Sequence, residues 1–287
     1  DYYKELQTTF KVLINSFYGY LGFAQGNFND YAMAEQVTAH GREILMSMEE
    51  YLSHAGATVI EMDTDGIYFQ PPPTISGPEK MEAGVQSVLP EGIEVELDAV
   101  YPAMFCYKSK NYALLNDDGE ITVSGAALKS RGLEPFQRDY IRQFLTLLLN
   151  GETDRLAPLA EEYRQAIRER RWELSKLAKT EVLNDSVDTY RKKLAEGKTR
   201  RSAVYELAAQ SSRDYRRGDQ ISFYLIGTKA KVPVVDNCRL LADAPPERDE
   251  NIAYYLNKFE ELHDKFESYV HGAPAGKDDD DQMELEF

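Results

Sequence analysis

The sequence predicts an α+β fold, in which an antiparallel sheet with packed helices precedes a mainly helical C-terminal region. Two segments, residues 58–69 and 94–124, are rich in strand-forming residues and are interrupted by Asp/Gly turns. Residues 1–17 and 32–54 instead carry apolar residues at helical spacing, and that spacing dominates from residue 136 onward. The chain has 287 residues, 43% of them hydrophobic, which is enough for about two compact units.

The first predicted helix, residues 1–17, has two distinct faces. Gln7, Lys11, Asn15 and Tyr18 recur at helical spacing and therefore share one polar face. This face suits a phosphate-bearing ligand with Lys11 as the cationic contact, although a solvated helix face is a common alternative. Glycines at 19, 22 and 26 are expected to break the helix. The opposite face is apolar and is expected to pack inside the protein; it comprises Leu6, Phe10, Leu13, Ile14 and Phe17.

The second predicted helix, residues 32–54, leads into a hairpin whose turn carries two carboxylates. The turn Asp63-Thr64-Asp65-Gly66 connects two short runs of strand-forming residues. Two carboxylates one residue apart repel each other unless a cation lies beside them. Mg²⁺ accepts one or two protein carboxylates together with phosphate oxygens, so Asp63 and Asp65 are candidate metal ligands. An ordinary Asp/Gly turn would use the same residues for backbone reasons.

A second hairpin is predicted after a loop and short helix at residues 74–90. Residues 94–105 alternate like a strand, and two further strand segments meet at the turn formed by residues 117–119. Lys110 and Tyr112 are two residues apart and are expected to share a strand face. One cation and one phenol on such a face suit a phosphate backbone and a base or sugar edge. An exposed charged strand is the alternative interpretation.

Lys129, Arg131 and Gly132 precede the helical region. The two cations have the reach for backbone phosphates, and the glycine permits close approach. Helices are then predicted at residues 136–149, 154–171, 185–196, 202–210 and 251–270, with a strand at 220–226 and an irregular basic stretch at 174–182.

Charge and composition restrict the classes of function. The net charge of −16 is at first unfavourable for nucleic-acid binding. Residues 155–231, however, hold 18 Lys and Arg against 11 Asp and Glu, so this region is basic enough to hold a duplex. Two cysteines without metal spacing indicate a reducing, cytoplasmic setting. Every apolar run is too short to cross a membrane.

Residues 272–287 are predicted to form a flexible tail, because they are rich in Gly, Ala and Asp and lack periodicity. The tail ends in apolar residues, which is unusual for a solvated segment. Gln282, Met283, Leu285 and Phe287 are spaced as anchors for the groove of a partner. Such a segment orders only on binding and would act as a tether. A chance six-residue pattern is the alternative.

The helix sequence Lys11-x-x-x-Asn15-Ser16-x-Tyr18-Gly19, followed by Asp63-Thr64-Asp65, resembles motifs B and C of the family B DNA polymerases. The resemblance implies an antiparallel palm sheet and a helical thumb. Its boundaries would be residues 1–18 for the end of the fingers, 19–133 for the palm, 134–271 for the thumb and 272–287 for the tail. The tail hexapeptide resembles the one with which bacterial polymerases bind the sliding clamp.

The resemblance also implies roles for individual residues. In that family, two Mg²⁺ ions serve the transfer of a deoxynucleotide from its triphosphate to a primer 3′ end. Asp65 would be the metal-ligating catalytic carboxylate, with Asp63 as its partner. The nucleotide site would comprise Gln7, Lys11, Asn15 and Tyr18, with Lys11 neutralising the triphosphate.

Two further elements resemble the parts of the family that hold DNA. Residues 107–115 are similar to its KKRY element, but Ser109 and Asn111 replace the basic neighbours. The segment before the thumb is similar to its (K/R)G(L/x)E element. The DNA-binding residues implied by the two elements are Lys110, Tyr112, Lys129, Arg131 and Gly132.

The family's motif A, an Asp before a Ser-Leu-Tyr-Pro run, does not occur in this sequence, and neither do its exonuclease motifs. Motif A supplies the other essential metal carboxylate. We therefore expect the C-terminal part or subunit of a replication or repair polymerase, active only with an N-terminal half and located with the nucleoid. Its expected partners are primer–template DNA, deoxynucleoside triphosphates, that half and the sliding clamp. The alternatives are an inactive polymerase-like module that binds primer–template DNA or recruits the clamp, and an unrelated Mg²⁺-dependent nucleotidyl enzyme.

Overall fold

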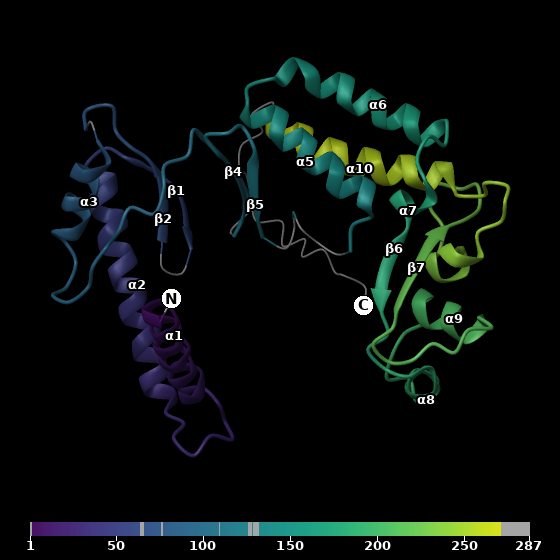
Figure 1. Cartoon of the computed structure of the whole chain (residues 1–287), viewed down its shortest axis with the longest axis horizontal. Helices are drawn as coiled ribbons and strands as arrows, with labels where there is room; N and C mark the ends of the chain where they lie inside the picture. The colour runs from purple at the N-terminus through teal and green to yellow at the C-terminus, as the bar shows by residue number, and fades with distance from the viewer. Residues whose placement is uncertain are drawn as a thin grey trace. The chain divides into compact units, whose positions relative to one another are not determined.

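The structure, a computed structural model, describes residues 2–63, 66–75, 77–108, 110–125, 128 and 132–270, except the side chains of Asp63 and Lys108. The chain divides into two compact units. The N-terminal unit comprises the residues up to 100 together with 108–110, and the C-terminal unit comprises 101–107 and the residues from 111 onward. Figure 1 shows helices and strands in both, and the strand pairs are antiparallel, so the predicted α+β class is confirmed.

Two long helices begin the N-terminal unit. Helix α1 spans Tyr2–Leu21 and helix α2 spans Tyr31–His54. The side chain of Asp30 caps α2 by accepting a hydrogen bond from the N–H of Met33 at 3.0 Å. The prediction that Gly19 breaks the first helix is wrong, because α1 continues through it. A Cβ at Gly19 would meet nothing within 4 Å, so the position is open and a helix tolerates glycine there.

The predicted hairpin follows α2. Strands β1 (Thr58–Asp63) and β2 (Gly66–Gln70) pair antiparallel, and the pairing closes with Asp63 opposite Gly66. Because this pairing is local in sequence, the alternation of strand-forming residues and the Asp/Gly turn were sufficient to predict it. The last residue of β1, Asp63, therefore lies at the closed end of the hairpin.

Helix α3 (Pro78–Gln86) packs against α2 and forms the core of the N-terminal unit with it. Gly84 of α3 permits this approach, because a Cβ there would lie 1.8 Å from the hydroxyl oxygen of Tyr51. Among the described residues, the fully buried hydrophobic side chains of this core are Leu52, Ala57, Met81 and Val85. Within the part of the chain that the structure describes, this core is small for a unit of this length.

The strand predicted at residues 94–105 is largely absent. Strand β3 begins only at Ala103 and spans Ala103–Lys108. Residues 94–101 have the sequence alternation of a strand, yet the described part of the chain provides no ladder partner for them. A strand is defined by pairing as much as by alternation, so the sequence pattern alone overestimated its length.

The C-terminal unit begins with a three-stranded sheet of order β3-β4-β5. Strands β4 (Asn111–Leu115) and β5 (Ile121–Ser124) form the predicted hairpin around residues 117–119. Gly119 adopts a φ of +81° in this turn, a conformation that favours glycine.

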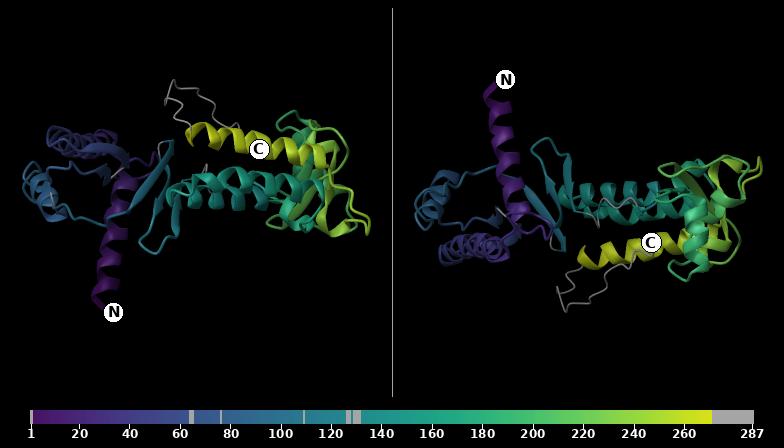
Figure 2. Two further views of the ribbon diagram at one scale, coloured as in Figure 1. Left: turned by 90° about the horizontal axis from the view of Figure 1, so that it is seen from above. Right: turned by 90° about the horizontal axis from the view of Figure 1, so that it is seen from below.

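Three helices lie side by side beyond this sheet, two consecutive ones and one from much later in the chain, as Figures 1 and 2 show. They are α5 (Pro135–Leu149), α6 (Leu156–Arg168) and α10 (Ile252–Val270). All three were predicted, and α5 ends as expected at Asn150, with Gly151 at a φ of +75°. In the described part of the chain, no helix combines the length and apolar character needed to span a membrane.

A second three-stranded sheet, of order β6-β7-β8, completes the C-terminal unit. Residues 174–182 were predicted to be irregular, but they contain a short helix and strand β6. This prediction was wrong because β6 pairs with β7, about 40 residues later, and such pairing leaves no local signal. The elements are α7 (Leu174–Leu177), β6 (Lys179–Val182), α8 (Val187–Ala195), α9 (Ala203–Gln210), β7 (Gln220–Leu225) and β8 (Cys238–Leu240), with 3₁₀ turns at Thr153–Arg155, Val234–Asp236 and Leu241–Asp243.

Aromatic rings fill the space between α5, α6 and α10. The ring of Tyr140 lies 4.8 Å from that of Phe259 and 5.0 Å from that of Tyr163, centroid to centroid. The Tyr140 hydroxyl also lies 2.7 Å from Nδ1 of His263, which satisfies two buried polar groups. Burial raises the pKa of Tyr163 to about 12, so its phenol stays neutral at physiological pH.

Glu134, at the N-terminus of α5, is a buried carboxyl whose titration should affect stability. The N–H of Glu134 donates to Oε1 of Gln137 at 3.2 Å as part of a capping box. Burial is the largest influence on the Glu134 carboxyl and raises its pKa above the usual range. A raised folded-state pKa stabilises the fold at low pH, and that stabilisation is lost as the pH rises through the raised value.

We therefore expect Glu134→Gln to be more stable than the unmodified protein at pH 8. The amide keeps an acceptor but avoids the burial of a charge. The difference in melting temperature should shrink as the pH falls toward about 4, because the carboxyl is then protonated in the folded state and increasingly protonated in the unfolded state. Thermal melts from pH 4 to pH 8 test this, with exposed Glu162→Gln as a matched control that should show little trend. A Glu134→Gln variant that is less stable at pH 8 would contradict it.

Candidate functional site

The four predicted nucleotide-binding residues lie together on α1. Gln7, Lys11, Asn15 and Tyr18 all occupy the predicted helix and are exposed. Their spacing places them on one face, as expected. Lys4 and Thr8, which were not predicted, lie seven and three residues before Lys11 and extend the same face toward the N-terminus. The periodicity that selected Lys11 would also have found them.

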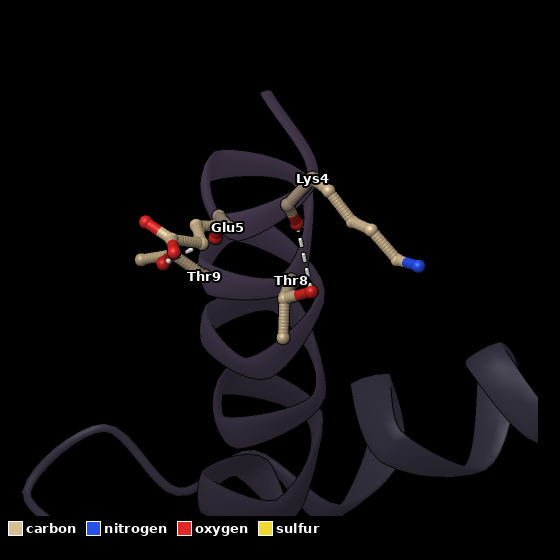
Figure 3. Close-up of a pocket in the computed structure, with 4 residues that line it drawn as sticks. All are labelled: Lys4, Glu5, Thr8 and Thr9. Carbon is tan, nitrogen blue, oxygen red and sulfur yellow. Dashed lines mark hydrogen bonds between the residues drawn. The ribbon is translucent and has the colours of Figure 1, made fainter. Parts of the chain in front are cut away.

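The N-terminal end of this helix has a shallow hollow, shown in Figure 3. Lys4, Glu5, Thr8 and Thr9 line it, and all four come from α1 alone. The hydroxyl of Thr8 donates to the carbonyl of Lys4, and that of Thr9 to the carbonyl of Glu5, each at 2.8 Å. Both hydroxyls already donate to the backbone, so the hollow offers no free hydroxyl donor to a ligand.

The apolar face of α1 does not pack as predicted. None of the residues of α1 is buried within the described part of the chain. Phe10 is 55% exposed, Ile14 66% and Phe17 69%. Isolated exposed hydrophobic residues are ordinary, but a contiguous face of them marks an interaction surface. The prediction of internal packing was therefore wrong for this chain by itself.

The hairpin β1–β2 carries the predicted metal-binding carboxylates. Asp63 is the last residue of β1, and its backbone pairs with Gly66. Asp65 and the side chain of Asp63 lie outside the described residues. No group of three or more His, Cys, Asp or Glu side chains that could hold a metal ion occurs among the residues that are described.

The predicted DNA-binding residues fall in three places. Tyr112 is in β4, half-buried and paired with Ser124 of β5. Gly132 lies before α5. Lys129 and Arg131 lie outside the described residues. The prediction that Lys110 and Tyr112 share a strand face is wrong, because β4 begins after Lys110.

Lys110 instead has a left-handed backbone, with a φ of +63°. Its N–H donates a hydrogen bond to Oε1 of Glu61 on β1, at 2.8 Å. Glu61 was not among the predicted site residues. No local pattern connects two residues that are 49 positions apart, so this contact required the folded structure.

Many cations of the basic region are occupied by acidic neighbours. Arg164 donates two hydrogen bonds to Glu260, both at 2.8 Å. This contact is the main reason that the pKa of Glu260 is lowered. Other exposed cations form no ion pair with any described residue and remain available for an anionic partner: Arg191, Lys192, Arg200, Arg213, Arg217, Lys229 and Lys231.

Comparisons with known proteins identify the family of this chain. The profile of DNA polymerase family B matches residues 1–266. "DNA polymerase 1" of Pyrococcus abyssi is 30% identical over 162 residues, which are 54% of this chain and 21% of that protein. The "DNA polymerase" of Thermococcus sp. (strain 9oN-7) is 34% identical over 140 residues, 47% of this chain and 17% of that protein.

The fold is also that of a solved polymerase. The structure of the family B DNA polymerase from Pyrobaculum calidifontis superposes with a TM-score of 0.67 at 21% identity, over 96% of this chain and 34% of that chain. The sequence printed above therefore spans about one fifth of the length of the relatives that it matches and one third of the solved chain.

Proposed function

This chain belongs to DNA polymerase family B, and we propose that it forms the C-terminal part of a template-directed DNA polymerase. One observation supports this most strongly. A helix with Lys11 and Asn15 on one face is followed by a hairpin whose first strand ends at Asp63, in the order that the family's motifs require. The proposed reaction adds deoxynucleotides to the 3′ end of a primer.

Asp63 and Asp65 would hold the metal ions. The donor set suits Mg²⁺, because carboxylates are hard oxygen ligands and the two are one residue apart in the sequence. Two bound Mg²⁺ ions would stabilise the attacking and leaving oxygens of an in-line displacement. This chain would contribute the two carboxylates, and the carboxylate of motif A would come from elsewhere.

The polar face of α1 would bind the incoming nucleotide. Lys11 would neutralise the triphosphate, Asn15 and Gln7 would donate hydrogen bonds, and Tyr18 would lie under the nascent base pair. The exposure of all four side chains supports the proposal, since a ligand can reach them from solvent.

Replacing Lys11 by alanine should raise the KM for deoxynucleotides by about 10- to 100-fold. A hydrogen bond to a charged group is worth about 1.5–3 kcal/mol, and the triphosphate would lose one. Steady-state primer extension measures this, with Lys80→Ala on the exposed surface of α3 as the control. An unchanged KM in Lys11→Ala would remove Lys11 from the nucleotide site.

Primer–template DNA would be held by Lys110, Tyr112, Lys129, Arg131 and Gly132. The unpaired cations of the C-terminal unit would add contacts to phosphates, which carry affinity without reading sequence. Their presence explains how a chain with a net charge of −16 can hold a polyanion.

The rest of the polymerase would cover the N-terminal unit. Burial of a large apolar side chain contributes about 1.5–3 kcal/mol, and α1 alone exposes Phe10, Ile14 and Phe17. The small core of the unit provides little compensation. We propose that the covering partner is the polymerase half that carries motif A, whether on a separate chain or in the same one. Mixing the chain with that half and measuring Mg²⁺-dependent primer extension tests the function.

The tail would bind the sliding clamp through Gln282, Met283, Leu285 and Phe287, which lie outside the described residues. Gln282 would take a polar pocket, and Leu285 and Phe287 an apolar groove. Deletion of residues 282–287 should leave extension of a short primed template unchanged but remove its stimulation by the clamp, because the tail raises effective concentration only. Extension assays with and without the organism's clamp measure this. Equal stimulation of both proteins would contradict the proposal.

A catalytically inactive module that binds primer–template DNA or recruits the clamp is the alternative. Retention of Lys11, Asn15, Asp63 and Asp65 in one chain argues against it. An inactive module would bind DNA without any requirement for Mg²⁺ and a deoxynucleotide.

A further inference from the structure

One carboxylate outside the predicted site contacts a residue inside it. Glu61 lies on β1, two positions before the last residue of the strand, Asp63. Its Oε1 accepts a hydrogen bond from the backbone N–H of Lys110 at 2.8 Å. Both residues belong to the N-terminal unit, although 49 positions separate them.

The backbone of Lys110 requires such support. Its φ of +63° lies in the left-handed region, which a side chain with a Cβ disfavours. Among the described residues, Arg170 is the only other non-glycine residue with a positive φ. A conformation of this kind persists where surrounding contacts fix it. A hydrogen bond from a backbone N–H to an ionised carboxylate is a strong contact of that type.

We propose that Glu61 is a positioning residue for DNA binding. Glu61 accepts a hydrogen bond from the N–H of Lys110 and so fixes the left-handed backbone of that residue. The fixed backbone in turn sets the position from which the Lys110 side chain extends. The acceptor lies on the strand that ends at Asp63. The contact therefore fixes Lys110, the proposed DNA contact, to the hairpin that carries the proposed metal ligands. This inference rests on the proposed function, because it takes Lys110 as a DNA contact.

Replacement of the acceptor is the first test. Glu61→Ala should raise the Kd of the full chain for a fluorescently labelled primer–template by about tenfold, roughly the value of one hydrogen bond to a charged group. Glu61→Gln keeps an acceptor oxygen but loses the charge, so its Kd should rise by about threefold, between the unmodified chain and Glu61→Ala. Exposed Glu94→Ala is the matched control and should have no effect. Fluorescence anisotropy measures the Kd, and thermal melts confirm that each variant is folded.

A double-mutant cycle with Lys110 is the second test. If Glu61 acts by placing the Lys110 side chain, Glu61→Ala should add little in a Lys110→Ala background, where that side chain is gone. Full additivity of the two substitutions would overturn the proposal. In the assembled polymerase, Glu61→Ala should raise the KM for DNA while the kcat changes little.

Two other results separate the possibilities. If Glu61→Gln is as harmful as Glu61→Ala and also raises the Mg²⁺ concentration needed for extension, Glu61 acts through its charge and the positioning role is rejected. If DNA affinity is unchanged in Glu61→Ala while Asp65→Ala still abolishes extension, this inference fails and the proposed function stands. If Asp65→Ala also extends primers normally, the proposed function itself fails.

Discussion

Replacement of Asp65 by alanine should abolish Mg²⁺-dependent primer extension by the chain assembled with its missing half. We expect a loss of at least about 1000-fold, since removing a metal ligand withdraws several kcal/mol of transition-state stabilisation and each 1.4 kcal/mol is worth about tenfold in rate. Binding of primer–template DNA should change far less, because phosphate contacts elsewhere dominate affinity. Single-turnover extension and DNA-binding assays measure the two effects.

The second Asp/Gly turn of the chain provides a matched control. Residues 117–119 connect β4 and β5 in a hairpin of similar composition. Asp117→Ala should leave extension unchanged, since this exposed turn carboxylate lies outside the proposed metal site. Extension that survives Asp65→Ala, or is lost equally in Asp117→Ala, would reject the assignment of the metal site.

Phe259→Ala should destabilise the C-terminal unit by about 3–5 kcal/mol, the usual cost of removing a large aromatic side chain from a core. Phe259 is completely buried. Its ring packs edge-to-face on Tyr140 and is stacked with Tyr163, at centroid distances of 4.8 and 5.8 Å. The guanidinium carbon of Arg164 also lies 5.7 Å from the ring centroid. The alanine variant would leave a cavity between three helices.

Denaturant titration followed by circular dichroism measures this loss. Val234→Ala, at a partly exposed position of the same unit, should change the free energy of unfolding by no more than about 0.5 kcal/mol. Phe259→Leu should fall between the two, because it fills part of the cavity. A loss below about 1 kcal/mol in Phe259→Ala would show that the three helices do not depend on this ring.

The local parts of the fold were predictable from sequence. Helix α2, the hairpin β1–β2 and helix α5 each carry their own signals: apolar spacing, an Asp/Gly turn and a terminal Asn-Gly pair. Strand β6 was missed because its partner β7 lies about 40 residues away. For residues 94–101 the error was the opposite one, since they alternate like a strand but have no strand partner in the described chain.

In the candidate site, too, the local features were predictable and the contacts between distant residues were not. The shared helix face of Lys11 and Asn15 follows from periodicity alone. The contact between Glu61 and Lys110 does not, and neither does the left-handed turn that removes Lys110 from the strand. The exposure of Phe10 and Phe17 had no sequence signal either, because amphipathic spacing shows that a face needs a partner but not which chain provides it.

Helix α10 has a consequence for how the molecule is made. Tyr140 of α5 meets His263 across 123 positions, and α6 packs on α10 across a similar span. On the ribosome, α5 and α6 therefore emerge long before the helix that completes their core. The core of the unit can close only after residue 266 has left the exit tunnel, so a product terminated before α10 would expose that core and be a substrate for chaperones or proteases.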